Sequence, residues 1–382
     1  MNKILICIFS FLLSISLIGC STTQDYLKNQ VDTTTQANEK LLNAKEENYK
    51  QTFGNVKILT VRAQLPDGRP WTELGISNKG EVFGIVPRNN EETSELIIFD
   101  VTNNKLRKIY SLSDDFQIYN FKFNDNYLVW IETTNSLDSS RLVVYDRKND
   151  KSEVINQINN RATQIPLDDI ALGSNYLLWS SGKENYDKVD YKIMKYSMET
   201  KKISVFMENA AKPIIGEYFI AWLGPEDERL QNSAIFFNDL RDTSVKKIIT
   251  SQNPQYLSTD GNSIIFSGVD KLDKNIKRIS LLENGQIKII RESATDYFEF
   301  PEISSNFIGW RGTTKLYVYC RANNKIAVLT EEFASYTNAY VSDNFILWHS
   351  PVIKDENEAK EKATEQGAYL SDLHIINVQD IK

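Results

Sequence analysis

One short phrase recurs along this chain and constrains the fold more than any other feature. It consists of a polar turn, an aromatic residue, two further residues that are mostly apolar, and a tryptophan. Five copies end in Trp, namely Tyr127–Trp130, Tyr176–Trp179, Phe219–Trp222, Phe307–Trp310 and Phe345–Trp348. A plainer copy ends at Phe266, and a fainter one places Gly84 at the same point. We call these seven residues the repeat positions; they are 46, 49, 43, 44, 44 and 38 residues apart.

A period of roughly 40–50 residues is typical of four-stranded propeller blades. Around each repeat position, runs rich in β-branched and aromatic residues alternate with turns rich in Asn, Asp, Ser and Gly, as in Ile118–Phe123 and Arg141–Asp146. Helical spacing of apolar residues is absent from the repeats. The sequence therefore predicts an all-β, seven-bladed β-propeller, with six or eight blades as the alternatives.

Each repeated tryptophan follows two mostly apolar residues within a predicted strand. Such a position favours packing between neighbouring blades, where a large flat ring buries much area. The alternative is a ring of aromatic residues around a ligand. Because the tryptophans are predicted in strands and not in loops, we interpret them as packing residues.

The last copy has no room for a fourth strand after Tyr369–Val378, since the chain stops at Lys382. Near the other end, Val56–Ala63 is a strand-like run with no partner in the first blade. Pairing this run with the last blade would close the ring and remove an open edge of unpaired backbone groups. We therefore predict that the N-terminal strand completes the seventh blade.

The N-terminus has the pattern of an exported lipoprotein. Lys3 precedes an apolar stretch, Ile4–Ile18, which is short for a spanning helix and suits a signal peptide. The stretch ends Leu17-Ile18-Gly19-Cys20, which resembles the bacterial lipobox, whose cysteine becomes the lipidated first residue. We predict a signal peptide over 1–19 and lipidation at Cys20; an uncleaved membrane anchor is the alternative. Both place the protein outside the cytoplasm on a bacterial cell membrane.

Residues 20–54 are polar and contain few apolar side chains. We interpret them as a flexible tether between the membrane and a propeller domain over 55–382. Within the tether, Asn38–Glu47 has a composition that could form a short helix, and a docking helix for a partner is the alternative reading.

One repeat resembles a known family. Its turn, Ser258-Thr259-Asp260-Gly261, is followed by the apolar run Ile264-Ile265-Phe266. This is similar to the repeat of TolB-like propellers and of the N-terminal propeller of dipeptidyl peptidase IV, although Thr259 stands where proline is usual. The resemblance implies a propeller over about 55–382. It implies no catalytic residue, because the peptidase's hydrolase domain has no counterpart here.

Composition excludes several kinds of function. The net charge of −7 and the lack of a basic stripe argue against nucleic acid. With only His349 and His374, a histidine-rich metal site is excluded, and no nucleophile, metalloprotease or phosphate-loop motif is present. No cofactor is predicted. Once Cys7 is cleaved off and Cys20 is lipidated, Cys320 is left as a single thiol in an alternating strand pattern, which indicates a buried structural cysteine.

Function is therefore expected in the loops between second and third strands, on one face of a monomeric propeller. The candidate binding residues are Glu226, Asp227, Glu228, His349, Asp355, Glu356 and Glu358. We expect a binding platform for a protein, peptide or glycan. The alternative is a hydrolase or lyase with carboxylates in the central channel, for which the candidates are Asp168, Asp169, Asp296 and Glu299.

Overall fold

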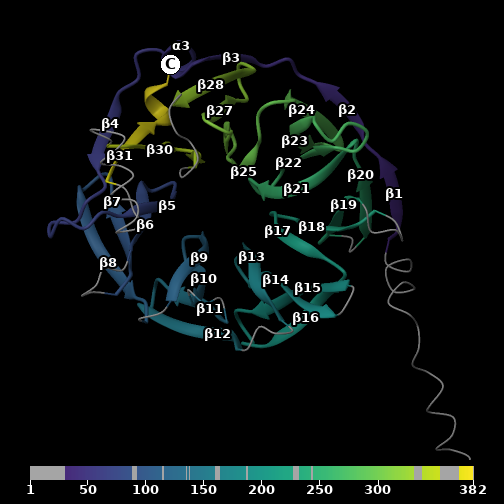
Figure 1. The fold of residues 1–382 in the computed structure, drawn as a ribbon, viewed down its shortest axis with the longest axis horizontal. Helices are drawn as coiled ribbons and strands as arrows, with labels where there is room; N and C mark the ends of the chain where they lie inside the picture. The colour runs from purple at the N-terminus through teal and green to yellow at the C-terminus, as the bar shows by residue number, and fades with distance from the viewer. Residues whose placement is uncertain are drawn as a thin grey trace, which may run out of the picture.

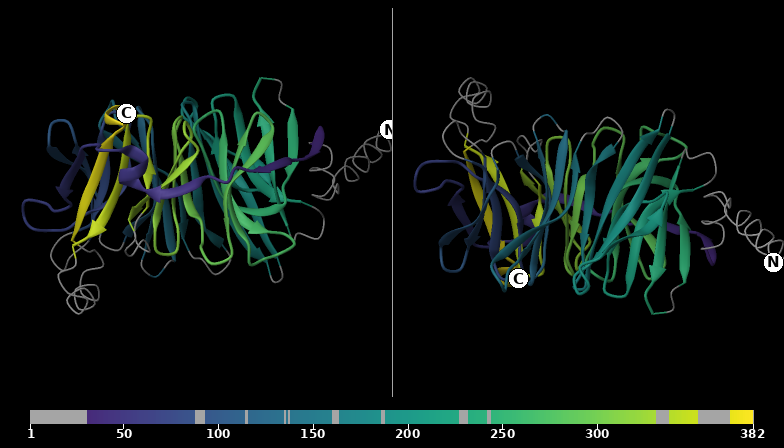
Figure 2. Two further views of the ribbon diagram at one scale, coloured as in Figure 1. Left: turned by 90° about the horizontal axis from the view of Figure 1, so that it is seen from above. Right: turned by 90° about the horizontal axis from the view of Figure 1, so that it is seen from below.

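The computed structural model describes residues 31–87, 93–113, 116–134, 136, 138–159, 164–185, 188–226, 232–241, 244–330, 338–352 and 370–381. Over these residues the chain is a seven-bladed β-propeller, which confirms the predicted fold (Figure 1). Edge-on views show a flat disc of steeply inclined strands (Figure 2). The predicted signal peptide and Cys20 lie outside the described residues. Within the described part of the chain, no helix has both the length and the apolar character needed to cross a membrane.

Each blade is an antiparallel meander that runs outward from the ring axis. The innermost strands are β5 (Thr72–Ile76), β9 (Phe116–Phe123), β13 (Gln164–Leu172), β17 (Ala211–Ile215), β21 (Gln252–Thr259), β25 (Glu299–Ile303) and β29 (Tyr340–Val341). The second strands are β6 (Glu81–Val86), β10 (Tyr127–Thr134), β14 (Tyr176–Asn185), β18 (Phe219–Pro225), β22 (Ile264–Asp270), β26 (Phe307–Arg311) and β30 (Phe345–Pro351).

The third strands are β7 (Glu95–Asp100), β11 (Ser139–Asp146), β15 (Lys188–Ser197), β19 (Ser233–Asp239), β23 (Lys277–Glu283), β27 (Leu316–Cys320) and β31 (Ser371–Asn377). The outermost strands of blades 1–6 are β8 (Lys105–Ser111), β12 (Lys151–Asn159), β16 (Ile203–Glu208), β20 (Val245–Ile249), β24 (Gln286–Ser293) and β28 (Lys325–Thr330). Blade 7 takes its outermost strand from the N-terminal part of the chain, as β4 (Ile58–Arg62).

The core consists of apolar clusters between neighbouring blades. All seven repeat positions lie on second strands, as predicted. The five tryptophans and Phe266 are buried and belong to six different clusters. Their role is packing between blades, which the sequence predicted. Truncating a buried Trp or Phe to Ala typically costs about 3–5 kcal/mol.

In blade 1 a different residue fills the space that the repeated tryptophan fills in other blades. At its repeat position, a Cβ atom on Gly84 would lie only 2.5 Å from Cε3 of Trp71. Trp71 is fully buried in the cluster between blades 7 and 1, beside Phe99 and Leu347. The ring of Trp71, which precedes the innermost strand, therefore packs directly over the glycine and takes the place of a tryptophan at position 84.

The segment before β4 forms a belt around the outside of the ring. β1 (Thr33–Gln36), β2 (Asn38–Leu41) and β3 (Lys45–Asn48) pair in parallel with β20, β24 and β28, adding a fifth strand to blades 4, 5 and 6 (Figure 1). One helical turn, α3 (Tyr49–Phe53), then leads toward β4. The predicted tether over 20–54 is thus incorrect for residues 33–54, and the short helix considered for Asn38–Glu47 is two strands. Unpaired outer edges of three blades supply the backbone partners that these polar residues lack by themselves.

Ring closure follows the predicted route. β4 pairs antiparallel with β31, with Ile58 opposite Ile376 and Arg62 opposite Asp372. Arg62 Nε also donates to Asp372 Oδ1 at 2.6 Å. The seventh blade therefore contains strands from both ends of the chain, and the belt and the closing strand form one continuous N-terminal segment.

Candidate functional site

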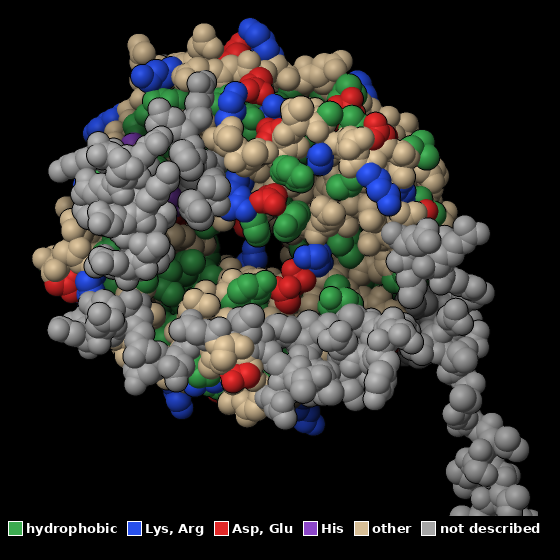
Figure 3. All heavy atoms as spheres, in the orientation of Figure 1, with side chains coloured by type: hydrophobic (Ala, Val, Ile, Leu, Met, Phe, Trp, Pro, Cys, Tyr) green, Lys and Arg blue, Asp and Glu red, His purple; other side chains and the backbone are tan. Residues whose placement is uncertain are grey.

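A hollow of about 640 Å³ lies on the ring axis. Residues from the innermost strands of all seven blades line it, from Leu74 on β5 to Val341 on β29. We call this hollow the channel. A space-filling view shows it open at the centre of the disc, with charged and hydrophobic side chains around its mouth (Figure 3). Its lining is mixed, so it can contact both the charged and the apolar parts of a ligand.

Bulges aim side chains into the channel. The pairing of the innermost strands with their neighbours shifts register in six blades, at Leu74, Tyr119, Asp169, Lys212, Gln255 and Phe300 or directly beside them. Three of these residues, Asp169, Lys212 and Phe300, have φ values of 47°, 53° and 48°. A non-glycine residue held in this left-handed region costs about 1–3 kcal/mol, and such strain gathers at functional sites. Bulges likewise often re-aim side chains beside active sites.

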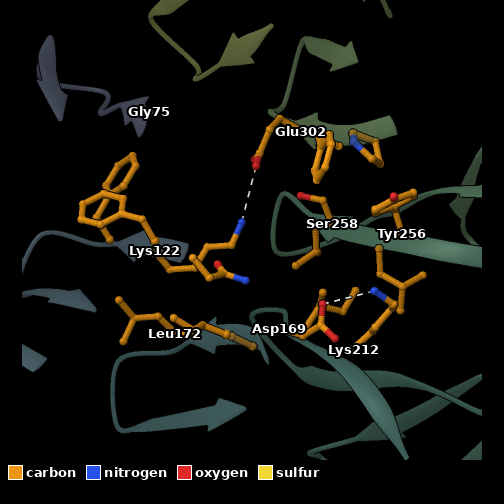
Figure 4. A pocket seen from close by; sticks show the side chains of 18 of the residues that line it. Gly75, Lys122, Asp169, Leu172, Lys212, Tyr256, Ser258 and Glu302 are labelled. Atoms are coloured by element: carbon orange, nitrogen blue, oxygen red, sulfur yellow. Dashed lines mark hydrogen bonds and ion pairs between the residues drawn. The ribbon is translucent and has the colours of Figure 1, made fainter. Parts of the chain in front are cut away.

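The strongest charge cluster lies on blades 3 and 4. Lys212 Nζ lies 3.3 Å from Asp169 Oδ1, and the ammonium group lies 5.4 Å from the centre of the Tyr256 ring (Figure 4). Burial and the charge of Asp168 raise the pKa of Asp169. Burial alone would lower the pKa of Lys212, but the charges of Asp169 and Asp168 outweigh it and raise this pKa. The cluster combines a carboxyl and an ammonium group, both with a raised pKa, and an aromatic face.

A second ion pair crosses the channel. Lys122 Nζ on β9 lies 3.4 Å from Glu302 Oε1 on β25, so blades 2 and 6 are joined through the hollow. Figure 4 shows the two side chains pointing toward one another from opposite walls. Both remain partly exposed. At this separation and exposure the pair contributes about 0–1 kcal/mol to stability, so a charged ligand can displace it with a small loss of free energy.

A second hollow, the side cleft, adjoins the channel. It has a volume of about 670 Å³ and lies among blades 3, 4 and 5, bounded by residues such as Ser181, Pro225 and Asn253. These residues lie at the ends of second strands or the start of an innermost strand, so the side cleft lies on the face of the loops between second and third strands. The two hollows share Asp168, Asp169, Lys212 and Tyr256. The shared residues make the charge cluster the boundary between channel and cleft.

The structure describes only part of the predicted loop site. Glu226 forms an ion pair with Lys271, and its carbonyl accepts a bond from Lys247 Nζ, so it connects neighbouring strands and blades. The other carboxylates expected in loops lie outside the described residues, namely Asp227, Glu228, Asp355, Glu356 and Glu358. Glu226 is therefore tied into the scaffold, with its carboxylate already paired.

His349, a candidate binding residue from the sequence, is instead buried between blades 7 and 1. Its Nδ1 lies 2.5 Å from Oε1 of Glu73 on β5, which is also buried. Burial by itself lowers the pKa of His349, but the charge of Glu73 and the hydrogen bond to it outweigh burial and raise the pKa. His349 lines neither the channel nor the side cleft. Its contacts join the last blade to the first.

The four carboxylates considered for channel chemistry divide into two groups. Asp168 and Asp169 line both hollows. Asp296 instead accepts bonds from Tyr317 Oη at 2.8 Å and from the backbone of Thr313 at 2.7 Å, which shapes the short loop after β26. Glu299 is paired with Arg311 at 2.5 Å and does not line the channel. Only the adjacent pair on β13 is available to a ligand.

Several residues of the site were missed from the sequence, although the repeat held the signal. The residue ten positions before each repeat position falls on the channel wall in blades 1, 3, 4, 5 and 6, at Leu74, Asp169, Lys212, Tyr256 and Phe300. In blade 2 the bulge shifts the match by one, to Tyr119. Lys122 and Glu302 share a second offset, eight residues before Trp130 and Trp310. Aligning the copies on the repeat position would have collected this set.

Cysteine and metal chemistry were also considered from the sequence. Cys320 is free and buried at the end of β27, as predicted for a structural thiol. Across the described ranges, no group of three or more His, Cys, Asp or Glu side chains is arranged to hold a metal ion.

Comparisons with known proteins agree on the fold. No family model matches this sequence, and no curated protein matches it. Among solved structures, the propeller domain of the trilobed protease from Pyrococcus furiosus aligns with a TM-score of 0.55 at 12% identity, covering 73% of this chain and 91% of that one. An oligogalacturonate lyase from Vibrio parahaemolyticus aligns with a TM-score of 0.54 at 8% identity, covering 86% of this chain and 100% of that one.

TolB from Acinetobacter baumannii is also among the similar structures, with a TM-score of 0.43 at 11% identity over 66% of this chain and 64% of its own. With a TM-score of 0.55, the trilobed protease provides a protease propeller among the neighbours, in line with the peptidase propellers that the sequence resembled. At these identities the likeness establishes the propeller fold, and the function has to be argued from the site.

Proposed function

We propose that this protein is a binding module, anchored to the outer face of a bacterial cell membrane, whose ligand enters the propeller from the face of the side cleft. The observation that carries the proposal is the row of bulged residues on the innermost strands. The backbone is left-handed at Asp169, Lys212 and Phe300, a conformation that costs free energy for a residue with a side chain. In return, two charged groups and an aromatic ring line a hollow that could hold several residues of a peptide or sugar chain.

The anchoring part of the proposal rests on the sequence of the N-terminus. If Cys20 carries lipid, only the segment up to Val31 separates the membrane from the belt. An extended chain spans about 3.5 Å per residue, so the propeller would stay within about 40 Å of the bilayer. Metabolic labelling with a palmitate analogue tests this. Label on the wild type but not on Cys20→Ala supports the anchor, and equal labelling of both contradicts it.

A capture experiment tests ligand binding. The full chain, purified in detergent and immobilised, is exposed to peptides and glycans released from cell envelopes, and the retained molecules are identified by mass spectrometry. We expect the double variant Tyr119→Ala, Phe300→Ala to lose the ligand. Tyr218→Ala is the matched control, because Tyr218 is also an exposed aromatic residue but lies in a turn outside the channel. Equal retention by all three proteins would contradict a channel site.

A second candidate function is a hydrolase or lyase. It is favoured by the raised pKa of Asp169, since a carboxyl that acts as a general acid near neutral pH needs a pKa above the ordinary value. One structural neighbour is an oligogalacturonate lyase. The test is product formation from oligogalacturonate and from peptides. Turnover that disappears in Asp169→Asn would establish an enzyme. If the oligogalacturonate and the peptides are not converted, the proposal of a binding module stands.

A further inference from the structure

One carboxylate in the channel has no direct ion-pair partner among the described residues, although the charge of Lys212 acts on it from further away. Lys212 is paired with Asp169, and Lys122 is paired with Glu302. Asp168 forms no ion pair with any described residue; its Oδ1 accepts the backbone N–H of Asp169 at 2.8 Å. Among the described channel residues, pairing therefore leaves the negative charge of Asp168 unbalanced. A negative charge in a partly enclosed hollow attracts cations and repels anions more strongly than the same charge on an open surface.

An aromatic residue accompanies this carboxylate. Tyr119 on β9 and Asp168 on β13 line the same channel from contacting strands of neighbouring blades, and the charge of Asp168 is the main cause that raises the pKa of Tyr119. The side chain of Tyr119 is 61% exposed and lines the channel. A carboxylate beside an open aromatic face is the environment in which proteins bind organic cations, because charge attraction and cation–π attraction act together.

Within the same channel, one carboxylate and one aromatic ring already hold an ammonium group of the protein. On the neighbouring blades, the ammonium of Lys212 lies between the carboxylate of Asp169 and the ring of Tyr256, at 3.3 Å and 5.4 Å. Asp168 and Tyr119 supply a further carboxylate and a further aromatic ring to the wall of the same channel. No described lysine or arginine lies over the Tyr119 ring or pairs with Asp168. The second pair is therefore equipped for an ammonium group that the described part of the chain does not supply.

We propose that the channel binds the lysine side chain of a peptide, with its ammonium group between the Asp168 carboxylate and the Tyr119 ring. A four-carbon stem suits this position, since it can follow the aromatic and apolar wall while the peptide main chain remains nearer the channel mouth. The innermost strands have a sheet neighbour on one side only, so their free edges offer hydrogen-bonding groups to a peptide backbone. This inference rests on the proposed binding function and specifies its ligand.

Isothermal titration calorimetry on the full chain in detergent tests the inference. The probes are three capped pentapeptides, Ala-Gly-X-Gly-Ala, in which X is lysine, norleucine or glutamate, together with a glucosamine oligomer and oligogalacturonate. We expect the lysine peptide to bind at least tenfold more tightly than the norleucine peptide, and the glutamate peptide not to bind. In Asp168→Asn the lysine peptide should fall to the norleucine level, and in Tyr119→Leu it should lose about two- to tenfold.

Asp125→Asn is the matched control, because it removes the same charge from an exposed turn outside the channel. It should bind the lysine peptide as the wild type does. Equal affinity for lysine and norleucine peptides would overturn the ammonium site but leave a channel that binds peptides. Tighter binding of a glucosamine oligomer than of the lysine peptide would overturn the peptide as ligand. Loss of binding in Asp125→Asn as well would mean that net charge, and not the channel, attracts the peptide.

Failure of every probe to bind would contradict both the lysine site and the proposed binding function. Binding of oligogalacturonate, an acidic polymer, in place of the lysine peptide would overturn the lysine site and favour the lyase alternative. Circular dichroism of each variant establishes that the propeller is intact. These outcomes separate failure of the inference from failure of the function on which it rests.

Discussion

Nδ1 of His349 lies 2.5 Å from Oε1 of Glu73, and this contact joins the seventh blade to the first. The two residues are 276 positions apart in the sequence, and both are buried. Together with the pairing of β4 and β31, the contact closes the ring from the inside and the outside. The ends of the chain are thus held by two independent sets of interactions.

Breaking the inner contact should destabilise the protein strongly. In His349→Leu the carboxylate of Glu73 stays buried without its partner, for which the expected loss in the free energy of unfolding is about 3–5 kcal/mol. Urea unfolding measures the loss. Glu208→Ala, which breaks an exposed pair with Lys192, is the control and should cost at most about 1 kcal/mol. Similar small losses in both variants would show that the His349–Glu73 pair contributes little to closure.

The same contact should make stability depend on pH. The pKa of His349 is raised in the folded protein above its ordinary value of 6.5. The folded state therefore holds this proton more tightly than the unfolded state. The contribution is fully present below about pH 6.5 and is lost as the pH rises through the raised pKa. Unfolding free energies of the wild type and His349→Gln, compared from pH 5.5 to 9, should converge with rising pH. A gap that widened with pH would contradict this sign.

The belt should protect only the blades that it covers. Backbone amides of β20, β24 and β28 lie next to a fifth strand, whereas β8, β12 and β16 have no described outer neighbour. We expect slower hydrogen exchange in the outermost strands of blades 4–6 than in those of blades 1–3. Deleting residues 31–48 should remove the difference. Equal exchange in the intact protein would mean that the belt is not stably paired.

Phe300 allows a test of whether the backbone is strained at a residue that lines the proposed binding site. Its φ of 48° suits glycine better than any residue with a side chain. Phe300→Gly should therefore be more stable than Phe300→Ala by about 1 kcal/mol. Both variants should bind ligand equally poorly, since both lose the ring. Thermal unfolding and calorimetry measure the two effects, and a Gly variant less stable than the Ala variant would argue against strain at this position.

Much of the fold could be predicted because the repeated residues are the ones that pack between neighbouring blades. Trp130 and Trp179 mark equivalent places on second strands, and their spacing led to the number of blades. The strand-like run at Val56–Ala63 and the short last repeat led to the closure by β4. These features depend on apolar side chains at regular intervals, and a single sequence displays such a pattern directly.

The belt and the channel were not predicted, for two different physical reasons. Thr33–Gln36 and Lys45–Asn48 are polar and show no alternation, so they are strands only because the edges of β20 and β28 pair with them. In the channel, the bulges break the alternation that would have shown which side chains face inward. Tyr119 and Lys212 therefore could not be found from alternation within a strand, and only their offset from the repeat positions marks them in the sequence.

The most direct test of the central claim is a crystal structure of the full chain with the lysine pentapeptide bound. We predict that the peptide lies in the channel, with its ammonium nitrogen about 2.7–3.2 Å from a carboxylate oxygen of Asp168 and its stem against the ring of Tyr119. A peptide bound on the outer rim or on the loops away from Asp168 would contradict the channel as the binding site.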